Sequence, residues 1–213
     1  SISDKKITIA QILPSIESGG VERGVFDLSK FSLSCGDIKI IVISAGGSMI
    51  KKFQQHKIHH IKLPVNSKNP ITIILNIFRL TKIIKKYNIN ICHARSRAPA
   101  WSTYFACKRT KCKFITTFHG VYSSKGFFSK NSFLKRRYNS IMVKPNLIIA
   151  VSNFIKKHII AEYPISESRI KVIHRGSDIE YFNKSNIHKE RIVKIIEKLQ
   201  LNDDKNIILL PGR

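Results

Sequence analysis

The segment KITIAQILPSIESGGVERGVFDL (residues 6–28) joins a near-continuous apolar run to apolar residues at helical spacing. The run ends at Pro14 and is typical of a strand buried on both faces of a parallel sheet. After it, Val21, Val25 and Leu28 recur at the spacing of one helix face, which predicts a helix to about residue 33. The segment therefore predicts a strand–loop–helix unit of an α/β fold.

The same alternation continues through the rest of the chain. Asn69 and Pro70 indicate a helix start, with an asparagine cap followed by proline, and Ser152 indicates another. Strands that alternate with helices predict a Rossmann-like parallel sheet with right-handed crossovers and helices on both faces. Further strands are expected at 38–44, 58–63, 89–93, 113–118, 146–151 and 170–173, with helices over 70–84, 99–108, 133–143, 153–161 and 188–199.

The charge of the chain is strongly positive and unevenly placed. The 213 residues carry 38 Lys and Arg against 13 Asp and Glu, a formal net charge of +25. Residues 38–161 contain 24 of the basic residues and no carboxylate. Paired-carboxylate catalysis and binding of Mg²⁺ or Ca²⁺ are therefore excluded for this middle region. The pattern favours anionic ligands such as phosphates, acidic lipids or nucleic acid.

The four cysteines, Cys35, Cys92, Cys107 and Cys112, form no CxxC pair. Small buried thiols in a reduced protein are the favoured interpretation. A zinc site on Cys107 and Cys112 is the alternative, although no second ligand pair has suitable spacing. No apolar run reaches the length of a membrane-spanning helix.

The loops that follow the predicted strands form the candidate site, because ligands of parallel sheets lie outside the carboxyl ends of the strands. Gly19 and Gly20 open a helix after the first strand, where backbone N–H groups and the helix terminus attract phosphate. A plain turn is the alternative. The spacing is not GxGxxG, so a standard dinucleotide site is not indicated.

Two further loops carry polar side chains at strand ends. Arg95, Ser96 and Arg97 follow the fourth strand and could fork onto a phosphate or carboxylate, or could be solvated arginines at a helix start. His119 follows the fifth strand, where it could donate a hydrogen bond or move a proton, or could be structural. By contrast, the segment 175–178 is interpreted as a tight turn with a local aspartate cap.

Six motifs together resemble family 4 glycosyltransferases of the GT-B fold, and their order fits the amino-terminal domain of that fold. Two of them are most similar to lipopolysaccharide-core sugar transferases of Gram-negative bacteria, including mannosyltransferases: HARSRAPAW (93–101) and TTFHGVY (116–122). The other four are GGVER (19–23), RYNSIM (137–142), IIAVSNFI (148–155) and VIHRGSDIEYF (172–182).

The resemblance implies a metal-free transfer of a hexose from a nucleotide-sugar to a glycolipid acceptor, with retention of configuration. The amino-terminal domain would hold the acceptor and a second Rossmann-like domain would hold the donor, whose phosphate helps to deprotonate the acceptor. His119 would lie beside the reacting sugar as the catalytic residue. Gly19, Gly20 and Arg213 would face the donor diphosphate, and Arg95, Ser96, Arg97, Gly120 and Tyr122 would line the acceptor side.

The resemblance also implies a division of the chain. Residues 1–183 would form the acceptor-side domain, 184–205 a linker and helix, and 206–213 the first strand of a truncated donor domain. The chain is then expected to be inactive alone, unless a separately encoded donor-domain chain completes it. It is expected to be cytoplasmic and peripheral, on the anionic inner face of the inner membrane. The alternative is a basic nucleic-acid-binding or membrane-surface protein without enzymatic activity, although no RNA or DNA motif is present.

Overall fold

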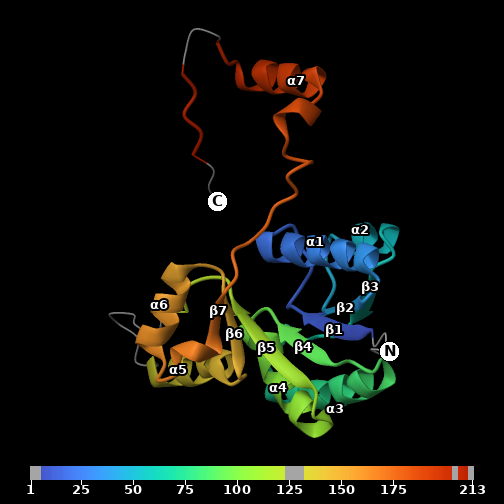
Figure 1. Ribbon diagram of the computed structural model, residues 1–213, viewed down its shortest axis with the longest axis vertical. Helices are drawn as coiled ribbons and strands as arrows, with labels where there is room; N and C mark the ends of the chain where they lie inside the picture. The colour runs from blue at the N-terminus through green and yellow to red at the C-terminus, as the bar shows by residue number, and fades with distance from the viewer. Residues whose placement is uncertain (1–5, 123–131, 203–205, 211–213) are drawn as a thin grey trace, which may run out of the picture. The chain divides into compact units, whose positions relative to one another are not determined.

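The computed structural model describes residues 6–122, 132–202 and 206–210, and these form a seven-stranded parallel sheet with helices on both faces (Figure 1). The strand order is β3-β2-β1-β4-β5-β6-β7. This confirms the predicted Rossmann-like α/β fold. The strands are β1 (Ile7–Ile12), β2 (Ile38–Ser44), β3 (His59–Lys62), β4 (Ile91–Ala94), β5 (Lys113–Phe118), β6 (Leu147–Ala150) and β7 (Ile170–Val172).

Helices α1 to α6 lie in the crossovers between successive strands, and α7 follows the last strand. Their bounds are α1 (Gly20–Cys35), α2 (Ile50–Gln55), α3 (Pro70–Lys86), α4 (Arg97–Thr110), α5 (Ser132–Asn139), α6 (Asn153–Glu162) and α7 (Lys189–Leu199), with short 3₁₀ turns η1 (Ser140–Val143), η2 (Glu167–Arg169) and η3 (Lys184–Asn186). The predicted caps at two helix starts are present. The side chain of Asn69 accepts from the backbone N–H groups of Ile71 and Thr72, and that of Ser152 accepts from Ile155.

The sheet separates two apolar layers. On one face, α1 and α2 pack on β1 and β2 through a buried cluster that includes Phe26 and Phe53. On the other face, α3 and α4 pack through a cluster that includes Leu80 and Ala106 (Figure 1). A strand covered on both faces is largely apolar on both, which explains the near-continuous apolar run of β1 and the apolar run of β2.

The strand order changes direction between β1 and β4. Ile9 of β1 pairs with Ile40 of β2 on one side and with Ile91 of β4 on the other. The connections after β1 and β4 therefore leave in opposite directions, and the loops at their carboxyl ends diverge. Such a switch point is where open parallel sheets bind their ligands.

Several boundaries differ from those expected. The structure adds α2, which has a single buried apolar residue, Phe53, and so is too short to show a helical period. The helix predicted over 133–143 divides into α5 and the 3₁₀ turn η1. β4 spans Ile91–Ala94, so it begins two residues later and ends one residue later than the strand expected at 89–93.

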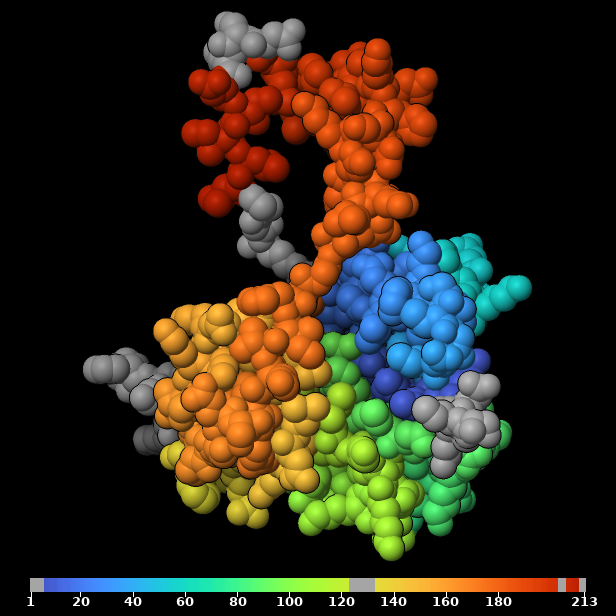
Figure 2. Space-filling model, viewed as in Figure 1, coloured from blue at the N-terminus to red at the C-terminus, as the bar shows by residue number. Residues whose placement is uncertain are grey.

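The chain divides into two compact units, Ser1–Arg175 and Gly176–Arg213. The second unit contains η3 and α7. Residues 206–210 form no strand within the described part of the chain, because a strand needs a hydrogen-bonded neighbour. Their apolar side chains are 64–95% exposed (Figure 2, red). The role of 206–213 as the first strand of a donor domain stays a prediction, as does the domain boundary at 183.

The loops after β1 and β2 are joined around Gly47, which offers a test of the fold. Gly47 has φ +149°, and a Cβ atom there would lie 2.7 Å from the backbone carbonyl of Ile16. Gly47→Ala is expected to lower the free energy of unfolding by about 2–3 kcal/mol, because backbone cannot move aside as a side-chain tip can. Urea denaturation measures this effect.

Gly24→Ala is the matched control for Gly47→Ala. Gly24 lies within α1, and a Cβ atom there would meet nothing within 4 Å. The free energy of unfolding of this variant is expected to rise by about 0.5–1 kcal/mol, because alanine has a higher helix propensity than glycine. Equal effects of the two substitutions would contradict the close packing of the two loops.

Candidate functional site

The carboxyl ends of β1, β4, β5 and β7 bring basic side chains to one end of the sheet. Arg95 follows β4, His119 follows β5 and Arg175 follows β7, and the charges of both arginines reach the His119 ring. The N-terminus of α1 follows the loop after β1. No carboxylate occurs between residues 38 and 161 to offset this positive potential.

Arg95 is held against the first strand. Its Nε donates to the Gln11 side-chain oxygen at 2.8 Å, and its backbone N–H donates to the Ile12 carbonyl at 2.8 Å. Burial lowers the pKa of Arg95 to about 10, with a smaller contribution from the nearby Arg175 charge. The guanidinium therefore stays positive at neutral pH, and the bond to Gln11 fixes its position.

Arg175 extends over the start of α1. A Cβ atom at Gly20 would lie 2.9 Å from Nη1 of Arg175, so the absence of a side chain at Gly20 leaves room for the guanidinium. A cation at a helix N-terminus faces the positive end of the helix dipole, which is unfavourable unless an anion lies between them. The Glu22 side chain packs against Gly19 in the same turn and supplies the nearby negative charge.

His119 is a partly buried polar side chain at this end of the sheet. Both of its ring nitrogens are buried, and neither has a hydrogen-bond partner among the described residues. Burial, together with the charges of Arg95 and Arg175, lowers the pKa of His119 to about 3. The ring is therefore neutral at physiological pH, with one nitrogen able to donate and the other able to accept. A Cβ atom at Gly120, the next residue, would meet nothing within 4 Å.

The lowered pKa of His119 predicts a pH dependence of stability. An unfolded histidine titrates near pH 6.5, so between about pH 6.5 and 3 the unfolded chain binds a proton that folded His119 does not. The free energy of unfolding should therefore decrease as the pH is lowered through this window. His119 contributes at most about 1.4 kcal/mol per pH unit to this decrease. Between pH 7 and pH 5, the free energy of unfolding of the wild type should decrease by about 2 kcal/mol more than that of His119→Gln. Urea denaturation at the two pH values measures this difference.

His56→Gln is the control for this titration, because His56 is exposed at the end of α2. His93 is buried as well and its pKa is also lowered, chiefly by burial. It is present in both proteins, so the difference between wild type and His119→Gln isolates His119. If the free energy of unfolding depended on pH in the same way in the wild type and in His119→Gln, the burial of an uncharged His119 ring would be contradicted.

The predicted acceptor-side residues lie around the start of α4, but Arg95 and Arg97 have different surroundings. Ser96 is the N-cap of α4, and its side chain makes no capping hydrogen bond. Arg97 donates to the Asn139 side-chain oxygen at 2.8 Å, and its guanidinium carbon lies 4.5 Å from the ring centre of Tyr122 and 5.8 Å from that of Tyr138. Cation–π contacts and a hydrogen bond thus account for Arg97 without a ligand.

Three neighbours of the site were not predicted as site residues. Gln11 is one of two polar residues within the first strand, with Thr8, and its place near the carboxyl end of the strand was the available signal. His93 bonds through Nε2 to the Thr117 hydroxyl at 2.7 Å and ties β4 to β5. Arg175 was assigned to a local turn, and its approach to Gly20 depends on a contact between distant segments. Arg213, expected on the donor side, lies outside the described residues.

The fold and this site define a Rossmann-like domain with an anion-attracting end. The family model described as Glycosyltransferase Family 4 matches residues 18–181, and the chain belongs to that family. No significant match was found among curated proteins. None of the described helices is both long and apolar enough to traverse a bilayer.

Solved glycosyltransferases share the fold. A glycosyltransferase from Rickettsia africae is 46% identical, with a TM-score of 0.81 over 98% of this chain and 53% of its own. Anabaena HepE, solved in complex with UDP, is 18% identical, with a TM-score of 0.69 over 91% of this chain and 50% of its own. The lipopolysaccharide outer core galactosyltransferase WaaB is 18% identical, with a TM-score of 0.61 over 81% of this chain and 47% of its own. The chain thus spans about half the length of these proteins.

Proposed function

We propose that this chain is the acceptor-side half of a retaining glycosyltransferase that moves a hexose from a nucleotide-sugar to a lipopolysaccharide-core or similar glycolipid acceptor. The observation that carries the proposal is the convergence of Arg95, Arg175 and the N-terminus of α1 around the unpartnered, neutral His119. Two arginines and a helix N-terminus near His119 attract an anion in addition to the Glu22 carboxylate, and a sugar diphosphate supplies one next to a reactive carbon.

The proposed chemistry assigns a different task to each group. The bond between the anomeric carbon and the diphosphate oxygen breaks, and the acceptor oxygen bonds to that carbon on the same face. The acceptor proton passes to the departing phosphate oxygen, so no protein base is required. Arg175 and the backbone N–H group of Gly20 stabilise the charge that develops on the diphosphate, whereas the Gly19 N–H donates to the Glu17 carbonyl at 3.0 Å. Because these groups supply positive charge themselves, the transfer is proposed to be metal-free.

His119 is proposed to orient the reacting groups rather than to act as an acid. With a pKa of about 3, its ring stays neutral and can donate to a sugar or acceptor hydroxyl through one nitrogen. Ser96, Gly120 and Tyr122 are proposed to line the acceptor side. Arg97 is proposed to act indirectly, by holding the Tyr122 ring in place.

The charge of the chain supports a proposal for the acceptor and the location. A net charge of +25 favours an anionic membrane surface, which would present a lipid-linked acceptor to the domain. We propose that the protein acts at the cytoplasmic face of the inner membrane, on an acceptor of lipopolysaccharide-core type, with mannose as the first sugar to test. Sedimentation with anionic but not with neutral vesicles is the expected result, and equal sedimentation with both would count against this location.

The donor is proposed to bind a second domain, carried on a continuing polypeptide or on a separate chain. Two observations support this. The chain spans about half of its solved relatives, and the apolar side chains of 207–210 are exposed. Without that domain the chain is proposed to be inactive, and Arg213 is proposed to contact the donor diphosphate.

The test joins the chain to the half of the fold that it does not span. The chain would be fused to the part of the Rickettsia africae protein that it does not span, and assayed with GDP-mannose, UDP-glucose and UDP-galactose on a lipopolysaccharide core. We expect transfer by the fusion, with the anomeric configuration retained by NMR, and none by residues 1–213 alone. Failure with every donor would overturn the function if the fusion is folded and binds UDP. Turnover by 1–213 alone would overturn its inactivity.

A further inference from the structure

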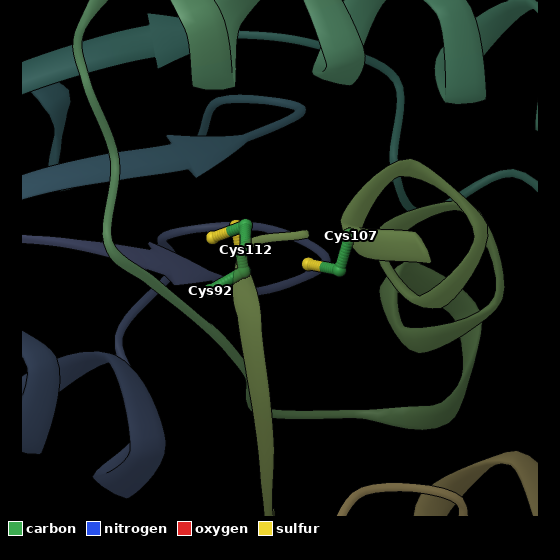
Figure 3. A group of neighbouring side chains, drawn as sticks. All are labelled: Cys92, Cys107 and Cys112. Carbon is green, nitrogen blue, oxygen red and sulfur yellow. The ribbon is translucent and has the colours of Figure 1, made fainter. Parts of the chain in front are cut away.

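Three of the four cysteines meet at the opposite end of the sheet from the candidate site. Cys92 is the second residue of β4, Cys107 lies near the end of α4, and Cys112 immediately precedes β5. Their sulfur atoms all lie within 4.8 Å of one another. Figure 3 shows the Cys107 sulfur directed from the helix toward those of Cys92 and Cys112.

The fold explains why these three residues meet. Cys92 pairs with Phe114 across the β4–β5 ladder, and side chains two residues apart on a strand share a face, so Cys112 points to the same side as Cys92. The helix α4 covers that face. Lys111, in the left-handed conformation at φ 57°, ends α4 and turns the chain back, which brings Cys112 beside Cys107.

The sulfur spacing matches that of a metal site. A tetrahedral ion with metal–sulfur bonds of about 2.3 Å separates its sulfur ligands by about 3.8 Å, and a trigonal one by about 4 Å. The Cys92 and Cys112 sulfurs are 3.7 Å apart. The sulfur of Cys107 lies at most 4.8 Å from the other two sulfurs, so it must approach them by at most about 1 Å to reach the spacing of a metal site. This is within the reach of a side-chain adjustment.

The surroundings select the kind of ion. Three sulfur ligands favour soft d¹⁰ ions such as Zn²⁺ or Cu⁺. The middle of the chain, residues 38–161, has no carboxylate to recruit a hard cation. Cys92 and Cys107 are buried, whereas Cys112 is partly exposed and provides an entry path. Lys111 and Lys113 flank Cys112 in the chain and favour the net negative charge of a three-thiolate complex.

We propose that Cys92, Cys107 and Cys112 bind one thiophilic d¹⁰ metal ion, with Zn²⁺ as the first ion to test. The ion is structural. It joins the end of α4 to the starts of β4 and β5, about 16 Å along the helix from Ser96 and Arg97. It takes no part in sugar transfer, so its test does not depend on the proposed enzyme activity.

The experiment uses the 213-residue chain, reduced and stripped with a chelator. Cd²⁺ titration should produce a thiolate charge-transfer band in the ultraviolet that saturates at about one equivalent. Competition with a chromophoric chelator should give the Zn²⁺ affinity, and Zn²⁺ should raise the Tm. Cys112→Ser should weaken binding by more than about 100-fold, because one of three thiolates is lost. Cys107→Ala should do the same.

Cys35→Ser is the matched control, because Cys35 is the exposed cysteine outside the cluster. It should bind as the wild type does. Near-ultraviolet circular dichroism establishes that each variant is folded. Three results would each overturn the proposal: no band below millimolar Cd²⁺, equal affinity in the wild type and the folded Cys112→Ser protein, or a disulfide within the cluster that persists in reductant.

Discussion

Replacing His119 with alanine is expected to lower the kcat of sugar transfer by about 10²–10³-fold in the fusion that contains a donor domain. The ring nitrogens have no partner within the described part of the chain, so their hydrogen-bonding capacity is proposed to serve the reacting groups. Because the ring is neutral throughout the working pH range, the kcat of the wild type should show no inflection near pH 6.5 from this residue. Initial-rate kinetics at saturating donor measure both effects.

The stability of His119→Ala distinguishes a chemical role from a structural one. Truncation removes packing, but it also removes two buried nitrogens without partners, so the free energy of unfolding should change by less than about 1.5 kcal/mol at pH 7. His56→Ala, at an exposed histidine, should keep its activity. A kcat within twofold of wild type for a folded His119→Ala enzyme would exclude His119 from the reaction.

Removing the Arg175 guanidinium is expected to weaken the binding of UDP by about 10–100-fold in the same fusion, because a charge-assisted hydrogen bond contributes about 1.5–3 kcal/mol. Arg175 is exposed, so Arg175→Ala should leave the fold intact. The loss should shrink as salt rises from 50 to about 300 mM, since the contact is largely electrostatic. Calorimetric titration with UDP measures the affinity.

The other arginine of the site provides a contrast. Arg95→Ala should weaken UDP binding and also destabilise the fold, because the buried Gln11 oxygen loses its donor at 2.8 Å. Arg79→Ala, at an exposed position of α3, should change neither property. If Arg175→Ala binds UDP as tightly as Arg79→Ala does, the anion does not lie between Arg175 and the N-terminus of α1.

The local parts of the fold could be predicted from the sequence. Apolar runs and their alternation with helical spacing located the seven strands, and the Asn69 and Ser152 caps located two helix starts. The short helix α2 was missed because it buries a single apolar residue. The strand order itself depends on pairing between distant segments, which no local pattern encodes.

The candidate site could be predicted only as far as it is local. The rule that ligands lie at the carboxyl ends of strands pointed to Gly20, Arg95 and His119. The approach of Arg175 to Gly20, and the attachment of Arg97 to Tyr122 and Asn139, depend on side-chain directions across loops. The third cysteine was missed for the same reason. Cys92 joins Cys107 and Cys112 only through the register of β4 against β5.

The central position of β1 has a consequence for the order in which the protein is made. Thr8 and Asn90, 82 residues apart, are joined by a hydrogen bond at 2.8 Å where β1 meets β4. During synthesis, β1–β3 can pair as soon as they leave the ribosome, but one edge of β1 stays open until β4 emerges. For that interval the nascent chain presents an apolar strand edge, the kind of surface that pairs with other chains. Slow translation between residues 44 and 91 would lengthen the interval, so the yield of soluble protein should depend on elongation speed in this stretch.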